Sequence, residues 1–92
     1  MRTMNIDYTV NIWREGAQYV AHAMPLDVAS SGADPDAARS AVDEAVRAFV
    51  GSCAKAGTLE AVLEEAGYQR QAEERWQSPS WVSVEQREVV VA

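Results

Sequence analysis

Apolar and polar residues alternate near the start of the chain, over residues 6–13. This two-residue period predicts a β-strand that buries one of its faces. A turn with a glycine follows at residues 14–17, and residues 18–24 are rich in small and β-favouring side chains. We therefore expect the two stretches to form a hairpin. The apolar side of the first strand contains Ile6, Tyr8, Val10 and Ile12.

Residues 25–32 are expected to hold a short third strand between two breaks. Pro25 ends the second strand, because proline has no N–H group to donate to a sheet. Residues 26–29 are suited to a strand. The run Ser30, Ser31 and Gly32 is then expected to interrupt the chain again.

The hydrophobic period changes from two to roughly 3.6 residues after Asp34. Asp34 is suited to cap free backbone N–H groups at a helix start, and Pro35 suits the first helical position. Gly57 is expected to end the helix, with Lys55 well placed at the negative end of the helix dipole. The pattern predicts one long amphipathic helix. Its apolar stripe contains Ala38, Ala41, Val42, Ala45, Val46, Phe49, Val50 and Cys53.

A second, shorter helix is expected after Gly57. Thr58 is a candidate N-cap, and Gly67 is expected to end the helix. Residues 69–77 are mostly polar, whereas residues 81–84 and 89–91 contain the valines typical of strands. We therefore predict a short helix followed by a C-terminal strand. The buried side of this helix contains Leu59, Val62, Leu63 and Ala66.

The chain has 92 residues, of which 48% are hydrophobic and 24% are charged, as in an ordinary globular domain. This length suits one domain, which we assign to residues 1–92 with a core at 6–68 and an extension at 69–92. A core this small gains stability from a partner. We therefore expect a homodimer or a larger assembly. Unpaired strands invite pairing, and the candidate contacts are Val89, Val90 and Val91.

The formal net charge of −6 argues against nucleic-acid binding, because affinity for phosphates comes mainly from Lys and Arg. The same charge favours a basic protein as partner. Cys53 is the only cysteine, so the chain forms no internal disulfide and has no Cys/His cluster with zinc-site spacing. The first residues are polar and no run approaches about 18 apolar residues. We expect no cofactor, no membrane contact and a cytoplasmic location.

Acidic residues and one histidine are the first candidates for partner contacts. Glu60, Glu64 and Glu65 fall within about one turn of the second predicted helix, so they form an acidic patch. A solvated docking patch is favoured over a metal site. His22 is the only histidine. It is able to transfer protons or to form a hydrogen bond across an interface, but a structural or solvated role is favoured for a lone histidine on a strand.

Three tryptophans are the other candidates. Trp13 lies on the strand face opposite Ile12, so it is expected to be partly exposed. It is either an interface anchor or a core residue, because aromatic side chains are common among binding hot spots. Trp76 and Trp81 are assigned to the covering of the core.

The order of these features resembles the HicB family. The resemblance depends on a strand at residues 8–12, the Tyr19-Val20-Ala21 strand, a proline, a short segment to Gly32 and an acid-capped helix with Ala37-Ala38. Residues 57–68 are also similar to the second helix of family members that lack a long C-terminal domain. The resemblance implies a reduced ribonuclease H-like fold of the α+β class. In this fold a three-stranded antiparallel sheet packs one face against the first helix, and a last strand can extend it.

The resemblance also implies an antitoxin that binds and blocks HicA, a small basic ribonuclease with a double-stranded-RNA-binding-like fold. Residues 69–92 lack the helix-turn-helix or ribbon-helix-helix pattern with which full-length HicB antitoxins bind their operator. We therefore predict an antitoxin-like module that sequesters a small basic ribonuclease by protein contact, without direct nucleic-acid binding. The candidate contacts are Trp13, His22, Glu60, Glu64 and Glu65.

Two alternatives remain at this stage. One is an orphan homo-oligomeric domain that has no toxin partner. The other is a ribonuclease H-like nuclease, which needs several carboxylates around two magnesium ions. Asp7 is the nearest candidate, but Asp43 and Glu44 are expected on the polar side of the long helix, away from the sheet. We therefore predict that the protein is not an enzyme.

Overall fold

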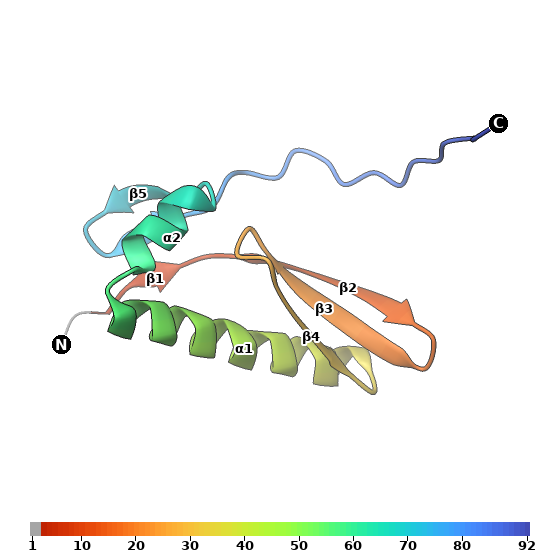
Figure 1. Cartoon of the computed structure of the whole chain (residues 1–92), viewed down its shortest axis with the longest axis horizontal. Helices are drawn as coiled ribbons and strands as arrows, with labels where there is room; N and C mark the ends of the chain where they lie inside the picture. The colour runs from red at the N-terminus through yellow and green to blue at the C-terminus, as the bar shows by residue number, and fades with distance from the viewer. Residues whose placement is uncertain (1–2) are drawn as a thin grey trace.

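The computed structural model describes residues 3–92 and contains two small sheets, one long helix and one short helix (Figure 1). The larger sheet is antiparallel, in the order β2 (Thr9–Glu15), β3 (Gln18–Met24) and β4 (Val28–Gly32). The smaller sheet has the order β1 (Asn5–Ile6), β6 (Arg75–Gln77) and β5 (Gln69–Ala72). The helices are α1 (Pro35–Ala56) and α2 (Leu59–Glu65). The predicted α+β class and the three-stranded antiparallel sheet packed on one helix are confirmed.

The hairpin of β2 and β3 confirms the first prediction. Gly16 lies in the turn with φ of 59°, which glycine adopts without strain. The register pairs Ile12 with Ala21 and Trp13 with Val20. Because successive residues of a strand point to opposite faces, the first pair faces α1 and the second pair faces away.

The third strand lies further along the chain than expected. Residues 26–29 were predicted as the strand and residues 30–32 as a break, whereas β4 includes the whole of 28–32. The reason is twofold: Asp27 occupies a left-handed turn conformation with φ of 60°, and residues 30–32 pair with β3. Gly32 is needed for a close approach to α1, since a Cβ atom there would lie 2.6 Å from the backbone nitrogen of Ala38.

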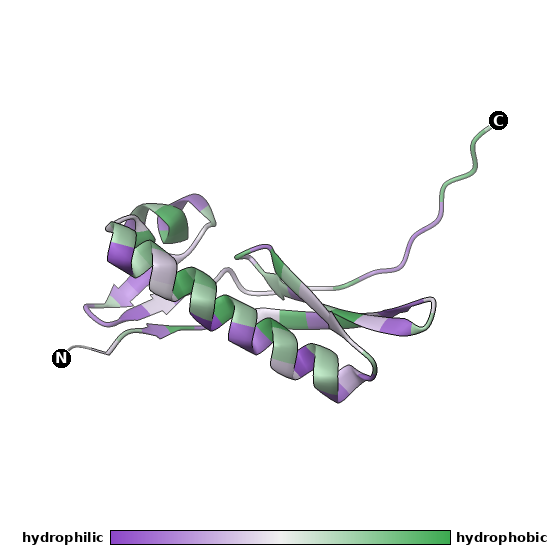
Figure 2. Cartoon of the chain, turned by 60° about the horizontal axis from the view of Figure 1, so that its bottom comes forward, coloured by the Kyte–Doolittle hydropathy of each residue, from purple (hydrophilic) through white to green (hydrophobic). Residues whose placement is uncertain are grey.

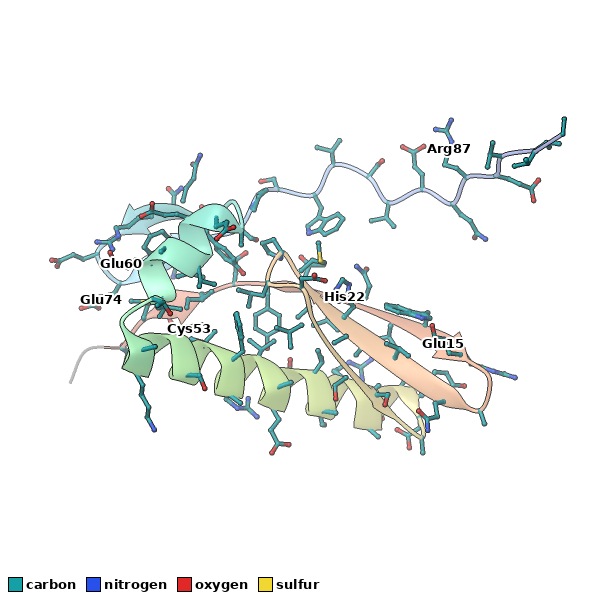
Figure 3. All side chains as sticks on the ribbon, in the orientation of Figure 1. Glu15, His22, Cys53, Glu60, Glu74 and Arg87 are labelled. Atoms are coloured by element: carbon teal, nitrogen blue, oxygen red, sulfur yellow. The ribbon has the colours of Figure 1, made fainter. Side chains whose placement is uncertain are left out.

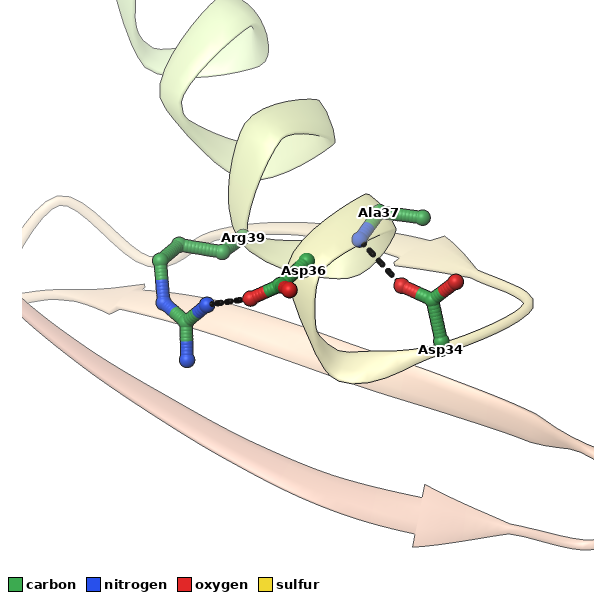
Figure 4. Close-up of polar contacts among 4 residues, drawn as sticks. All are labelled: Asp34, Asp36, Ala37 and Arg39. Carbon is green, nitrogen blue, oxygen red and sulfur yellow. Dashed lines mark hydrogen bonds and ion pairs between the residues drawn. The ribbon is translucent and has the colours of Figure 1, made fainter.

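Helix α1 begins and ends where its local signals predict. The carboxylate of Asp34 accepts a hydrogen bond of 2.7 Å from the backbone N–H of Ala37 (Figure 4). Asp36 and Arg39 form an ion pair in the first turns. At the other end, Gly57 closes the helix with φ of 75°.

The core forms between α1 and the covered face of the larger sheet. Figure 2 shows hydrophobic and hydrophilic bands alternating along α1, as expected for an amphipathic helix. Cys53 is partly buried and packs against this core, as predicted. Small side chains on β3 let the helix approach closely. The buried residues of the core are Ala21, Ala23, Leu26, Ala38, Val42, Val46, Leu59, Leu63, Tyr68 and Trp76.

Helix α2 forms as predicted, but its predicted N-cap is wrong. The side chain of Thr58 makes no cap hydrogen bond; its hydroxyl donates to the carbonyl of Cys53 at 3.3 Å. Thr58 follows Gly57 directly, so its hydroxyl satisfies the end of α1 instead of the start of α2. Gly67 follows the end of α2 with a positive φ of 98°, a conformation that glycine adopts without strain.

Residues 69–78 pair with the N-terminal strand and complete the folded unit. β6 runs parallel to β1, with Asn5 opposite Arg75 and Ile6 opposite Trp76. Trp76 is buried, which confirms its assignment to the core. A C-terminal strand is therefore present, and the folded unit extends beyond the expected core boundary at Tyr68.

The segment 79–92 has no regular secondary structure and extends away from both sheets (Figure 1). The strands predicted at 81–84 and 89–91 are therefore wrong for the single chain. Trp81 was assigned to the core, but 49% of it is exposed. The physical reason is Pro79, which has no N–H group with which to continue the ladder after β6.

Candidate functional site

The larger sheet has one covered face and one open face. α1 lies along the covered face, whereas no helix of residues 3–92 lies over the other (Figure 1). The strand registers place alternate residues on this second face. We define the open face by Trp13, Val20, His22, Met24, Ala29 and Ser31.

Two aromatic rings from neighbouring strands meet on the open face. Trp13 and His22 are diagonal neighbours on β2 and β3, and their ring centroids are 6.2 Å apart with an edge-on angle of 80°. Trp13 is 41% exposed, as the alternation predicts. A large aromatic surface is therefore presented to solvent on a paired hairpin.

A carboxylate holds each of these two rings. The indole nitrogen Nε1 of Trp13 donates to Oε1 of Glu15 at 3.2 Å. The His22 Nε2 atom lies 2.6 Å from Oδ1 of Asp27, within hydrogen-bond distance. Figure 3 shows Glu15 and His22 on the hairpin, with Glu15 nearer to its turn. The aromatic pair is thus oriented before any partner arrives, and negative charge lies beside it.

The sequence did not identify Glu15 or Asp27 as site residues. The alternation does place Glu15 beside Trp13, since Glu15 lies two positions after Trp13 on the same face of one strand. Asp27 is brought to His22 by the turn between β3 and β4, where it has positive φ. No local signal in the sequence predicts that turn geometry.

The first residues of the segment 79–92 border one end of the open face. Residues 79–83 and the Met24-Pro25 turn line an open hollow of about 430 Å³, with Trp81 in its wall. Met24 belongs to the open face, so the hollow is continuous with that surface. Trp81 is therefore a second partly exposed tryptophan close to the larger sheet.

The predicted acidic patch lies elsewhere. Glu60 forms an ion pair with Arg70, whose guanidinium lies 4.8 Å from the centre of the Trp76 ring. Glu60 therefore helps to hold β5 against α2, while Glu64 and Glu65 are exposed. Figure 3 places Glu60 at the opposite end of the molecule from Glu15. The structure does not bring the acidic helix together with Trp13 and His22.

The predicted oligomerisation residues are also separate from the open face. Val89, Val90 and Val91 lie in the segment 79–92, and between 83 and 88% of each is exposed. They follow Trp81 by about eight residues along an extended chain. They form a third surface, separate from the open face and from the acidic residues of α2.

The carboxylate of Asp7 has a structural role. It accepts hydrogen bonds from the backbone N–H of Ser78 at 2.7 Å and from the Ser78 hydroxyl at 2.6 Å. The hydroxyl of Tyr68 donates to the Asp7 carbonyl at 2.6 Å. These contacts join the connection between β1 and β2 to the residues before and after the small hairpin of β5 and β6.

The position predicted for Asp43 is wrong. Asp43 was placed on the polar side of α1, but it is half-buried and accepts a hydrogen bond of 2.6 Å from the hydroxyl of Tyr8. It lies at the edge of the helix face, next to Tyr8 in the connection between β1 and β2. Among residues 3–92, no group of three Asp, Glu, His or Cys side chains is arranged to hold a metal ion.

Two tyrosines near these carboxylates have raised pKa values. Burial, followed by the hydrogen bond to Asp43, raises the pKa of Tyr8 to about 12. Burial and then the negative charge of Asp7 raise the pKa of Tyr68 to about 12. Both hydroxyls therefore stay protonated and act as donors at neutral pH.

No helix in the described part of the chain has both the length and the apolar character needed to cross a membrane. Comparisons of the chain with models of protein families, with curated proteins and with solved structures give no match.

Proposed function

We propose that the chain is a protein-binding module that docks a small basic protein on its open face. The observation that carries this proposal is the exposed Trp13 ring, packed edge-on with His22 and hydrogen-bonded to Glu15. Tryptophan on a rigid support is a frequent hot spot, because it buries a large area at little entropic cost.

Charge supports a basic partner. Glu15 and Asp27 are exposed beside the aromatic pair, and the chain as a whole has a net charge of −6. Complementary charges accelerate encounter and favour one orientation of the partner. Glu64 and Glu65 contribute to the long-range field from α2, although they do not adjoin the open face.

We further propose that the domain is a reduced ribonuclease H-like fold and a HicB-like antitoxin module. The support is the order of three antiparallel strands followed by a helix. A later strand, β6, pairs with β1 in the smaller sheet. The partner is then a HicA-like basic ribonuclease, which the module sequesters by contact. This role requires no catalytic residue, and the Asp7 carboxylate is already engaged by Ser78.

A second candidate is an orphan homo-oligomeric module. One specific observation favours it: the exposed valines of the segment 79–92 give the chain a second apolar surface. In this case the open face contacts another copy or a regulatory partner, and no basic ribonuclease is encoded nearby.

The deciding experiment is calorimetric titration of the full chain with the small basic protein encoded next to it. We expect binding at micromolar or lower concentration. The affinity is expected to fall when Trp13 is removed, and association is expected to slow when the charges of Glu15 and Asp27 are removed. An absence of binding, or of any such neighbouring protein, favours the orphan module. Glu44→Gln on the polar side of α1 is a matched control, because it removes one negative charge far from the open face.

A further inference from the structure

The segment 81–91 has the composition of a strand but no strand to pair with. It contains Trp81 and five valines among its eleven residues, and these valines are 76–97% exposed. Valine and tryptophan are residues that favour β-structure. An exposed extended stretch of this kind presents unpaired N–H and C=O groups along with its apolar side chains.

The free edge of β2 is an acceptor for such a strand. β2 is an outer strand of the larger sheet, and half of its backbone N–H and C=O groups point away from β3. α1 packs chiefly against β3 and β4, so Val10 and Ile12 on β2 are only half-buried. A strand added here pairs these backbone groups and covers these side chains.

The chain does not fill this edge with its own segment. β6 pairs with β1 in parallel, and continuation of the same register would bring Val82 beside Ile12. The ladder stops because Asp7 binds Ser78 and the next residue, Pro79, has no N–H group. The segment then extends away from β2 (Figure 1). Within one chain, the segment 81–91 and the edge of β2 therefore both remain unpaired.

We infer that residues 81–91 form a strand on the β2 edge of a second copy, and that two copies exchange these segments reciprocally. A two-fold arrangement satisfies both surfaces of both copies and closes without further growth. The length is sufficient, because eleven extended residues span about 36 Å and the seven residues of β2 span about 23 Å. This inference does not depend on the proposed basic partner.

The assembly is tested by analytical ultracentrifugation of the full chain over a range of micromolar concentrations. We expect a species of twice the 10.1 kDa chain mass. A monomer that persists at high micromolar concentration overturns the inference. Binding of the basic protein is measured separately, so failure of one proposal is distinguishable from failure of the other.

Two proline variants test the strand itself. The N–H groups of residues 84 and 85 point to opposite sides of an extended strand, so Val84→Pro and Glu85→Pro together sample both edges. At least one of them is expected to raise the dimer dissociation constant tenfold or more. Val84→Thr keeps the N–H group and the β-branched shape, and it is the matched control. Unchanged dimerisation in both proline variants contradicts the exchange.

Hydrogen exchange identifies the paired surfaces. On concentration from monomer to dimer, we expect slower amide exchange in residues 9–15 and 81–91 together. Slower exchange in residues 9–15 alone indicates pairing of two β2 edges, and slower exchange in 81–91 alone indicates another acceptor. Either result overturns the reciprocal exchange.

Discussion

The two faces of the larger sheet come from the same three strands, but around the middle of β3 they differ in side-chain size. The covered face has Ala21 and Ala23, which are fully buried, whereas the open face has Trp13 and His22. Small residues lie under α1 because the helix must approach the sheet closely. The large rings lie where packing within the chain does not require them, so their position is better explained by binding than by stability.

The largest expected effect contrasts adjacent residues on the two faces. Ala21→Leu is expected to lower the free energy of unfolding by about 3 kcal/mol, because the fully buried site has no room for three more carbon atoms. Val20→Leu, on the open face, is expected to change it by less than about 0.5 kcal/mol. Urea unfolding of both variants measures the difference. Equal losses would show that the open face is packed as tightly as the covered face.

Trp13→Ala, on the open face, is expected to lower partner affinity and to leave stability nearly unchanged. We expect partner affinity to fall by about 2 kcal/mol, or about 30-fold in Kd, mainly through faster dissociation. The urea midpoint is expected to change little, because Trp13 packs on no buried core residue. Calorimetry and surface plasmon resonance give the affinity and the rates. A large loss of stability with unchanged affinity would make Trp13 a structural residue.

Alkaline pH is expected to lower the stability of the folded chain through Tyr8 and Tyr68. The pKa values of Tyr8 and Tyr68 are raised from 10 to about 12 in the folded chain, so their contribution is complete below pH 10 and is lost between pH 10 and 12. Stability measured by urea unfolding should therefore fall over this interval. The double variant Tyr8→Phe/Tyr68→Phe should show a shallower fall. If both proteins fall equally, other groups cause the loss.

The smallest effect concerns charge at the open face. Glu15→Gln keeps an oxygen acceptor for Trp13 and Asp27→Asn keeps one for His22, and each variant removes one negative charge. We expect association with a basic partner to slow a few-fold at low salt and to depend less on ionic strength. Stopped-flow rates at two salt concentrations test this. Glu44→Gln should leave the rate nearly unchanged, and a similar loss there would indicate that only total charge matters.

Local signals in the sequence predicted the elements whose causes are local. The Asp34 cap and the Gly57 terminus fixed α1, and the alternation in β2 placed Trp13 on the exposed side. β4 was misplaced because its start depends on the conformation of Asp27 and on pairing with β3. The Trp13–His22 pair follows from the hairpin register once the turn is known, but the Asp27 contact does not.

The contact between Asp7 and Ser78 could not be predicted from spacing. Its partners are 71 positions apart, and neither residue carries a pattern that indicates the other. The same holds for Trp81, whose composition suggests burial although the chain offers it no core position. Such positions are decided by tertiary pairing, which a single sequence does not display.

The parallel pairing of β1 with β6 also sets an order of events during folding. The larger sheet and α1 are continuous in sequence from Thr9 to Ala56, so their contacts close short loops. β1 leaves the ribosome first, yet its partner strand appears about seventy residues later. Because long loops close slowly, β1 is expected to wait for β6 while the hairpin, β4 and α1 assemble. The N-terminal strand β1 is thus expected to be the last strand to form its native pairing.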